Sequence, residues 1–142
     1  MPPRIVVDTN VFIAAILSPA GENRDVLRVC LRGKARPIMG AALFHEYEDL
    51  LGRSELMAKS PLAEMERQSL LEAFLSVTDW IKVYFLWRPN LPDEADNHLI
   101  ELALAGSAET IVTNNLSDLL HGELRFPGLK IQNPRQFLST LP

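Results

Sequence analysis

Short runs of apolar residues alternate along the chain with longer segments in which apolar residues recur every three or four positions. The short runs are typical of buried strands, and the longer spacing is typical of helices with one buried face. The predicted strands cover residues 5–7, 35–40, 80–86, 109–114 and 129–132. The predicted helices cover residues 11–17, 23–31, 41–51, 60–77 and 94–105, with a terminal helix from 133 onward.

Caps and breakers set the expected helix ends. Asn23 is suited to cap the second helix, and Gly33 lies just past its end. Gly52 and Gly106 close two later helices, and Pro61 is suited to the first turn of the helix at 60–77.

Alternating strands and helices predict right-handed crossovers and a mostly parallel sheet that is covered on both faces. The 142 residues contain no repeat, low-complexity tract or linker, so we expect one α/β domain over residues 1–142. In such sheets the functional crevice lies outside the carboxyl ends of the strands.

Composition narrows the class of protein. Apolar residues make up 47% and charged residues 23%, as in ordinary globular proteins, and no apolar run reaches the ~18 residues of a membrane span. There is no signal-peptide pattern, and the single cysteine, Cys30, excludes an internal disulfide and a Cys-rich zinc site, so we expect a cytoplasmic protein. The histidines lack zinc spacing and are expected at the surface or beside acids: His45, His98 and His121. A net charge of −4 argues against a general nucleic-acid binder, but not against an enzyme whose carboxylates are neutralised by metal ions.

The stretch "RIVVDTNVFIAAIL" places Asp8, Thr9 and Asn10 between two apolar runs. Asp8 follows the first predicted strand, so its side chain is expected to face the crevice. A second interpretation is that Asp8 only caps the helix that follows.

Glu46 lies on the apolar stripe of the helix at 41–51, beside Leu43 and Leu50. A carboxylate at the edge of a buried face is costly unless it is paired or binds a cation. The alternative is that Glu46 reaches solvent or pairs with an arginine.

Two further acidic groups follow. Asp93, Glu94 and Asp96 lie at a helix start, where the helix dipole alone favours negative charge, and Asp96 lies one turn before the core residue Ile100. In "IVTNNLSDLL" a predicted strand is followed by hydroxyl, amide and carboxylate side chains, as the first predicted strand is. The acid could instead simply cap a turn. These polar residues are Thr113, Asn114, Asn115 and Asp118.

If the first and fourth strands are neighbours, Asp8, Glu46, Asp96 and Asp118 converge on one crevice. Converging carboxylates repel one another, and hard cations such as Mg²⁺ or Mn²⁺ relieve that repulsion. Ions of this kind support phosphodiester hydrolysis without a nucleophilic serine or cysteine. The four acids are therefore predicted to be catalytic and to bind the metal.

Four segments, "IVVDTNVFIAAIL", "LFHEYEDLLGR", "DEADNHLIELALAG" and "TIVTNNLSDLL", resemble the acidic motifs of the PIN domain family, in the same order. The arrangement is most similar to the toxin components of prokaryotic toxin–antitoxin systems, over nearly the whole chain. The resemblance implies an α/β/α sandwich and a Mg²⁺- or Mn²⁺-dependent ribonuclease that cuts single-stranded RNA. It also implies an antitoxin partner and a homodimer or higher oligomer.

The same resemblance implies that Asp8, Glu46 and Asp96 bind metal and that Asp118 is a fourth ligand, directly or through water. Asn10 would orient Asp8 or the metal-bound water. Asn115 stands where many relatives have an acid, which weakens any second metal site. Asp93 remains an alternative to Asp96 as the third acid.

Arg24, Arg28 and Arg32 recur at four-residue spacing on the second helix and could follow an RNA backbone. They could equally form a solvated face or a surface for an acidic antitoxin tail. A catalytically silent PIN-like binding module is the main alternative function, because of Asn115. A phosphoaspartate enzyme or receiver fits poorly, because "DTN" lacks a second Asp and no lysine follows a late strand.

Overall fold

The computed structural model describes residues 2–18, 21–83, 94–116, 126 and 128–142, with the backbone alone for 94–97. Its elements, in chain order, are β1 (Arg4–Val7), α1 (Thr9–Leu17), α2 (Glu22–Leu31), β2 (Arg36–Met39), α3 (Ala41–Leu51), α4 (Ser54–Met57), α5 (Glu64–Ser76), β3 (Asp79–Trp80), α6 (Glu94–Ala105), β4 (Thr110–Val112), β5 (Lys130–Gln132) and α8 (Pro134–Ser139).

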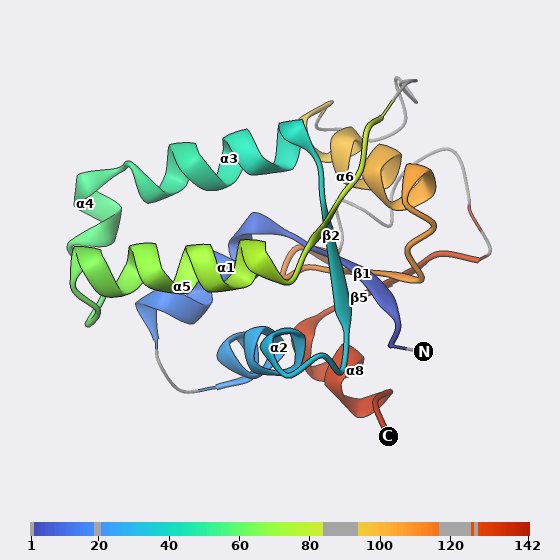
Figure 1. Cartoon of the computed structure of the whole chain (residues 1–142), viewed down its shortest axis with the longest axis horizontal. Helices are drawn as coiled ribbons and strands as arrows, with labels where there is room; N and C mark the ends of the chain where they lie inside the picture. The colour runs from blue at the N-terminus through green and yellow to red at the C-terminus, as the bar shows by residue number, and fades with distance from the viewer. Residues whose placement is uncertain (1, 19–20, 84–93, 117–125, 127) are drawn as a thin grey trace.

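The strands form one parallel sheet in the order β3-β2-β1-β4-β5 (Figure 1). The first strand therefore lies in the centre, beside the fourth, which meets the condition under which the acidic motifs were expected to converge. The register pairs Val7 with Val112, so the residues that follow these two strands emerge side by side. The strand order reverses direction between β1 and β4, which is where parallel sheets of this kind open a crevice.

Helices cover both faces of the sheet, which confirms the predicted α/β/α layering. Helix α6 contacts β1, β2 and β4, while α1, α2 and α8 pack together on the other side (Figure 1). The apolar residues of β1 are buried, with at most 1% exposed for Ile5, Val6 and Val7. This explains why the strand is a continuous apolar run rather than an alternating one.

Helices α3 and α5 lie side by side at one end of the sheet (Figure 1). Three rings join them to α1: Phe12 and Tyr47 have centroids 5.1 Å apart, and Tyr47 stacks on Phe74 at 6.2 Å. The Tyr47 hydroxyl donates a 2.8 Å hydrogen bond to the carbonyl of Val7. Helix α3 is thereby tied to the last residue of β1.

Two helix starts differ from the sequence prediction. Helix α2 begins at Glu22 after Gly21, whose φ of 107° turns the chain, so Asn23 is inside the helix instead of capping it. Helix α5 begins at Glu64, and the Ser60 hydroxyl, before the helix, donates to the carbonyl of Ile16 and accepts from the Leu62 amide at 3.1 Å. Glu66 accepts a hydrogen bond from the Ala63 amide at 2.8 Å and so caps α5.

The third strand is shorter than its apolar run. Ladder pairing covers Asp79 and Trp80, the Ile81 amide donates to the Met39 carbonyl, and the predicted strand residues from Tyr84 onward lie outside the described residues.

On α5, Leu71 and Phe74 are buried, whereas Met65 is 82% exposed and is not a core residue. No helix among the described residues combines the length and hydrophobicity needed to cross a membrane.

We expect Tyr47→Phe to lower the free energy of unfolding by about 1 to 2 kcal/mol. The phenylalanine keeps the ring contacts but removes the donor from the Val7 carbonyl, which is buried. Urea denaturation at constant m-value measures the change. A stability equal to that of the wild-type protein would mean that this bond does not tie α3 to β1.

Candidate functional site

Asp8 follows β1 and is the residue that precedes helix α1. Its backbone carbonyl accepts a bond from the Val11 amide, but its side chain makes no cap hydrogen bond. The carboxylate instead accepts hydrogen bonds through Oδ2, from the Thr113 hydroxyl at 2.8 Å and from the Asn10 amide at 3.3 Å. The Asp8 side chain is therefore held both by the residue that follows the neighbouring strand β4 and by Asn10 in the first turn of α1.

Thr113 lies directly after β4, is fully buried, and joins the polar residues of the two strand ends. Its hydroxyl donates to Asp8 and accepts from Asn10 Nδ2 at 3.3 Å and from the Asn115 amide at 3.0 Å. Asn10 Oδ1 in turn accepts from the Asn114 amide at 3.1 Å. The hydroxyl thus uses its one donor and two acceptor positions.

Glu46 approaches the same place from α3. Its Oε1 accepts a hydrogen bond from the Thr9 hydroxyl at 2.8 Å, and its Oε2 lies 2.9 Å from His98 Nε2. Because the carboxylate accepts, Nε2 is assigned as the protonated ring nitrogen. His98 Nδ1 is buried and meets no hydrogen-bond partner among the described residues.

The two acids have opposite electrostatic environments. Burial raises the pKa of Asp8, the nearby Glu46 raises it further, and the Thr113 hydrogen bond opposes both effects. The hydrogen bond from His98 lowers the pKa of Glu46, helped by Thr9 and opposed by burial. Without a cation, Glu46 is the readily ionised acid and Asp8 is the one whose charge is costly.

Asp8, Asn10, Glu46 and Asn115 line a single pocket of ≈ 400 Å³, which we call the acid pocket. Its remaining wall is apolar and comes from α1 and α3: Ile13, Ala14, Leu17 and Leu50. Four residues that the sequence singled out in three separate motifs are thus brought together. The pocket opens at the carboxyl ends of β1 and β4, as the strand topology predicts.

A family model described as the PIN domain matches residues 4–117. The chain belongs to the PIN domain family. Members of this family are typically metal-dependent nucleases.

Among solved structures, the PIN domain is similar to the crystal structure of VapBC2 from Rickettsia felis bound to a DNA fragment from their promoter. The TM-score is 0.57 at 19% identity, over 92% of this chain and 98% of that chain. Identity this low shows a shared fold. No curated protein matches the chain.

The other predicted acids are only partly described. Asp96 lies in the first turn of α6, whose backbone is described there, while its side chain is not. Asp93 and Asp118 lie outside the described residues. Within the described part of the chain, no three His, Cys, Asp or Glu side chains form a group that could hold a metal ion. Asp8 and Glu46 are the two described carboxylates that line the acid pocket.

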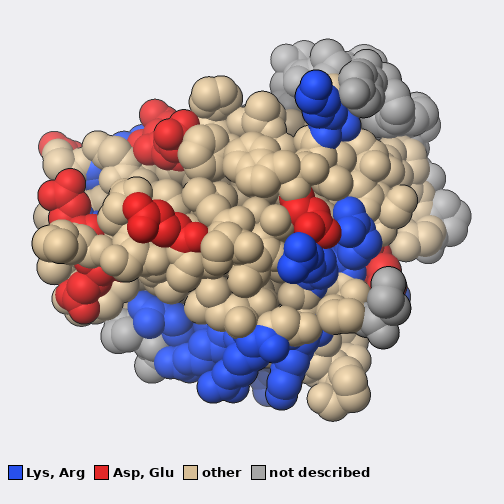
Figure 2. Space-filling model, in the orientation of Figure 1, with Lys and Arg blue, Asp and Glu red and all other residues tan. Residues whose placement is uncertain are grey.

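The predicted arginine stripe lies on α2 and forms part of a basic surface of the PIN domain. Arg24 donates to the Ala15 carbonyl of α1, Arg28 pairs with Asp25 at 2.7 Å, and Arg32 is exposed. Figure 2 shows Lys and Arg side chains gathered along the lower edge, where Figure 1 places α2. We call Arg28, Arg32 and Lys34 the basic face.

Helix α2, which carries the basic face, begins beside the acid pocket. Asn23, in the first turn of α2, accepts a hydrogen bond from the Asn114 side chain at 2.8 Å, and Asn114 contacts Asn10. Arg24, the next residue, holds the end of α1 that lines the pocket. Arg24 thus anchors a pocket wall, and the exposed cations lie one and two turns further along α2.

Thr9 and His98 are the site residues whose contacts with Glu46 the sequence did not indicate. Thr9 is 1% exposed and holds Glu46. For His98, the expectation of a position at the surface or beside an acid is confirmed in its second form, because its side chain is 12% exposed and lies against Glu46. The available signal was that His98 lies on a helix with a buried face.

We expect Asp8→Asn to stabilise the metal-free protein by up to about 2 kcal/mol at pH 8. A raised pKa means that the folded state binds the Asp8 proton more tightly than the unfolded state. Wild-type stability therefore falls as pH rises from the unfolded pKa, near 3.8, through the folded pKa, and the variant avoids this loss. Urea denaturation in chelator at pH 8 and pH 5 should show a smaller gain at pH 5.

Glu48→Gln, on the exposed side of α3, is the matched control and should show no such gain. A gain for Asp8→Asn that is larger at pH 5 than at pH 8 would contradict the electrostatic explanation.

Proposed function

We propose that this PIN domain is a Mg²⁺- or Mn²⁺-dependent endoribonuclease that hydrolyses phosphodiester bonds in single-stranded RNA. The observation that carries the proposal is the presence of the Asp8 and Glu46 carboxylates in one pocket at the carboxyl end of the central strand. Membership of a family of typical metal-dependent nucleases supports it.

The donor set of the acid pocket is suited to a hard divalent cation. Its polar side chains are carboxylates and amides, whose oxygens are the ligands that Mg²⁺ and Mn²⁺ prefer. The raised pKa of Asp8 indicates that its neighbours stabilise the buried carboxylate charge only in part. A bound cation would stabilise that charge. We assign Asp8 and Glu46 as ligands and propose Asp96 and Asp118 as the remaining acids.

A bound Mg²⁺ or Mn²⁺ ion supplies Lewis acidity, which acidifies water and neutralises charge that develops on the phosphodiester. The chain's own residues orient the ligands. Thr113 and Asn10 hold the Asp8 carboxylate, while Thr9 and His98 hold both oxygens of Glu46. Asn115 lines the pocket as a neutral residue, which favours one metal ion over two.

The basic face and the fold suggest the partners. We propose that Arg28 and Arg32 contact the RNA backbone, which they would position without specifying its sequence. The fold shared with a VapBC2 structure supports a role as the toxin of a toxin–antitoxin pair, with an antitoxin as protein partner. We also propose a homodimer, in which α5 with its exposed Met65 is the candidate contact.

The second candidate function is a catalytically silent PIN-like module that binds RNA or protein. The neutral Asn115 in the acid pocket is the observation that favours it. Metal affinity separates the two functions, because a silent module would bind the cation too weakly for turnover.

Calorimetry with Mn²⁺, paired with RNA cleavage assays on the same preparations, tests the proposal. We expect the wild-type protein to bind Mn²⁺ and to cut single-stranded RNA. Glu46→Gln and Asp8→Asn should lose cleavage at least about 100-fold, together with most of the metal affinity. Each variant removes a ligand charge while preserving side-chain shape.

Glu48→Gln, the same change two residues further along α3 on its exposed side, should leave binding and cleavage unchanged. Cleavage by Asp8→Asn at the wild-type rate would refute the assignment of the site. Wild-type protein that binds no Mn²⁺ at millimolar concentration would favour the silent module.

The double variant Arg28→Ala, Arg32→Ala should bind single-stranded RNA more weakly, by about the same factor for different sequences. Losing two phosphate contacts should reduce the slope of log K against log salt by about 1.4. Lys59→Ala, an exposed cation beyond α4, serves as the control. An unchanged salt slope in the double variant would show that the basic face does not contact the RNA backbone.

A further inference from the structure

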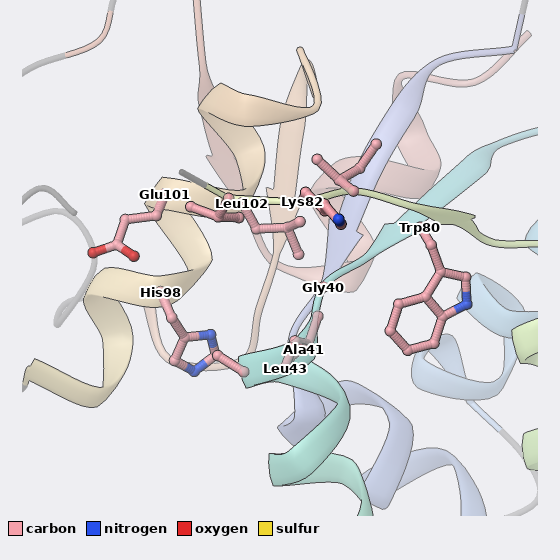
Figure 3. Close-up of a pocket in the computed structure, with 11 residues that line it drawn as sticks. Gly40, Ala41, Leu43, Trp80, Lys82, His98, Glu101 and Leu102 are labelled. Carbon is pink, nitrogen blue, oxygen red and sulfur yellow. The ribbon is translucent and has the colours of Figure 1, made fainter. Parts of the chain in front are cut away.

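A second, larger pocket lies on the same edge of the sheet as the acid pocket. Its volume is ≈ 680 Å³, within the range of ligand sites, and it lies between the ends of β2 and β3 and helix α6 (Figure 3). Because parallel strands end at a common edge, this pocket is displaced from Asp8 by the width of one or two strands. We call it the Trp80 pocket.

The walls of the Trp80 pocket are mostly apolar, with a few polar groups. Trp80 lies at one end, His98 and Glu101 lie at the other, and Leu102 is part of the wall between them (Figure 3). Lys82 is exposed and adds positive charge at the rim. Apolar walls with a few polar groups are typical of sites for a flat, amphipathic small group.

Trp80 is unusual for a strand residue because its side chain is largely available. The residue is 55% exposed, and its ring makes a T-shaped contact with Phe44 at a centroid distance of 5.4 Å and an angle of 64°. This contact holds the indole and leaves more than half of the residue exposed. A fixed, exposed aromatic ring at a pocket is suited to stack against another flat ring.

His98 lies between the two pockets. The residue lines the Trp80 pocket, and its Nε2 lies 2.9 Å from Glu46 Oε2 in the acid pocket. An RNA strand whose phosphodiester lies beside Asp8 and Glu46 therefore has an adjoining apolar cavity for its next nucleotide. The base of that nucleotide would be unstacked.

We propose that the Trp80 pocket is a nucleobase subsite, in which the base of a nucleotide next to the cleaved bond stacks on Trp80. The proposal rests on the ribonuclease function proposed above and adds a second, base-dependent contact to it. Stacking selects unpaired nucleotides, because a paired base is not free to enter the cavity. It also tolerates different sequences, because every base offers a π-face.

The alternative occupant is an apolar side chain from a protein partner. The position of the pocket next to the acid pocket, with His98 between them, and the exposed cation Lys82 at the rim both favour a nucleotide, which carries a phosphate beside its base. The two occupants differ in one measurable property, since only an RNA base can be deleted while the ribose-phosphate chain is kept.

Fluorescence anisotropy in the non-cleaving Asp8→Asn background tests the subsite. The probes are a labelled mixed-sequence RNA hexamer and an abasic ribose-phosphate hexamer of the same length. Trp80→Ala should weaken binding of the RNA hexamer about tenfold and leave the Kd of the abasic hexamer within twofold. Trp80→Phe, which retains an aromatic ring, should restore most of the affinity.

Lys59→Ala removes an exposed side chain beyond α4 that lines neither pocket, and it should alter neither Kd. Equal weakening of both hexamers by Trp80→Ala, or no weakening of either, would overturn the base subsite. If Trp80→Ala weakens binding of the RNA hexamer alone, and the wild-type protein does not cleave RNA, the subsite is supported and the proposed catalysis is refuted. Absence of binding to either hexamer would refute both.

Discussion

The parallel pairing of β1 with β4 is the constraint on which the acid pocket depends. Its register sets Val7 opposite Val112, so Asp8 and Thr113 leave the sheet together and meet at 2.8 Å. The Asp8 amide also donates to the Val112 carbonyl at 2.9 Å, which fixes the backbone at this position. A register shift of one residue would exchange the side chains between the two faces of β1 and would separate this pair.

Burial of Asp8 gives the site its chemical character. The protein provides Glu46 with His98 and Thr9, but it provides Asp8 with neutral donors only among the described hydrogen bonds. The pKa values of the two acids are therefore moved in opposite directions. A cation that binds Asp8 must compete with its proton, so metal binding, proton release and folding stability are coupled through one carboxyl group.

The fold class and the polar residues at the strand ends could be predicted from the sequence because both are local signals. Apolar runs marked the strands, and Asp8, Asn10 and Asn115 were recognised because they interrupt such runs or follow them. Glu46 was recognised because it lies on an apolar stripe.

The roles of Thr9 and His98 could not be predicted in the same way. Each depends on a contact with Glu46, 37 and 52 residues away along the chain. The predicted start of α5 was wrong as well, since α5 begins at Glu64 and Ser60 bonds the carbonyl of Ile16, 44 residues earlier. A capping pattern read from neighbouring residues gives no information about such distant acceptors.

The strand order places two different pockets along one edge of the sheet. The Trp80 pocket adjoins the ends of β2 and β3, and the acid pocket adjoins those of β1 and β4. Helix α2 starts beside the acid pocket, where Asn23 accepts from Asn114, and ends shortly before the start of β2, so the basic face extends away from the pockets toward the opposite edge. A strand of RNA bound as proposed would use the pocket edge for its base and its reacting phosphate, and α2 for its remaining phosphates. The separation of cations on α2 from the carboxylates of the acid pocket lets a chain with a net charge of −4 present a local basic surface.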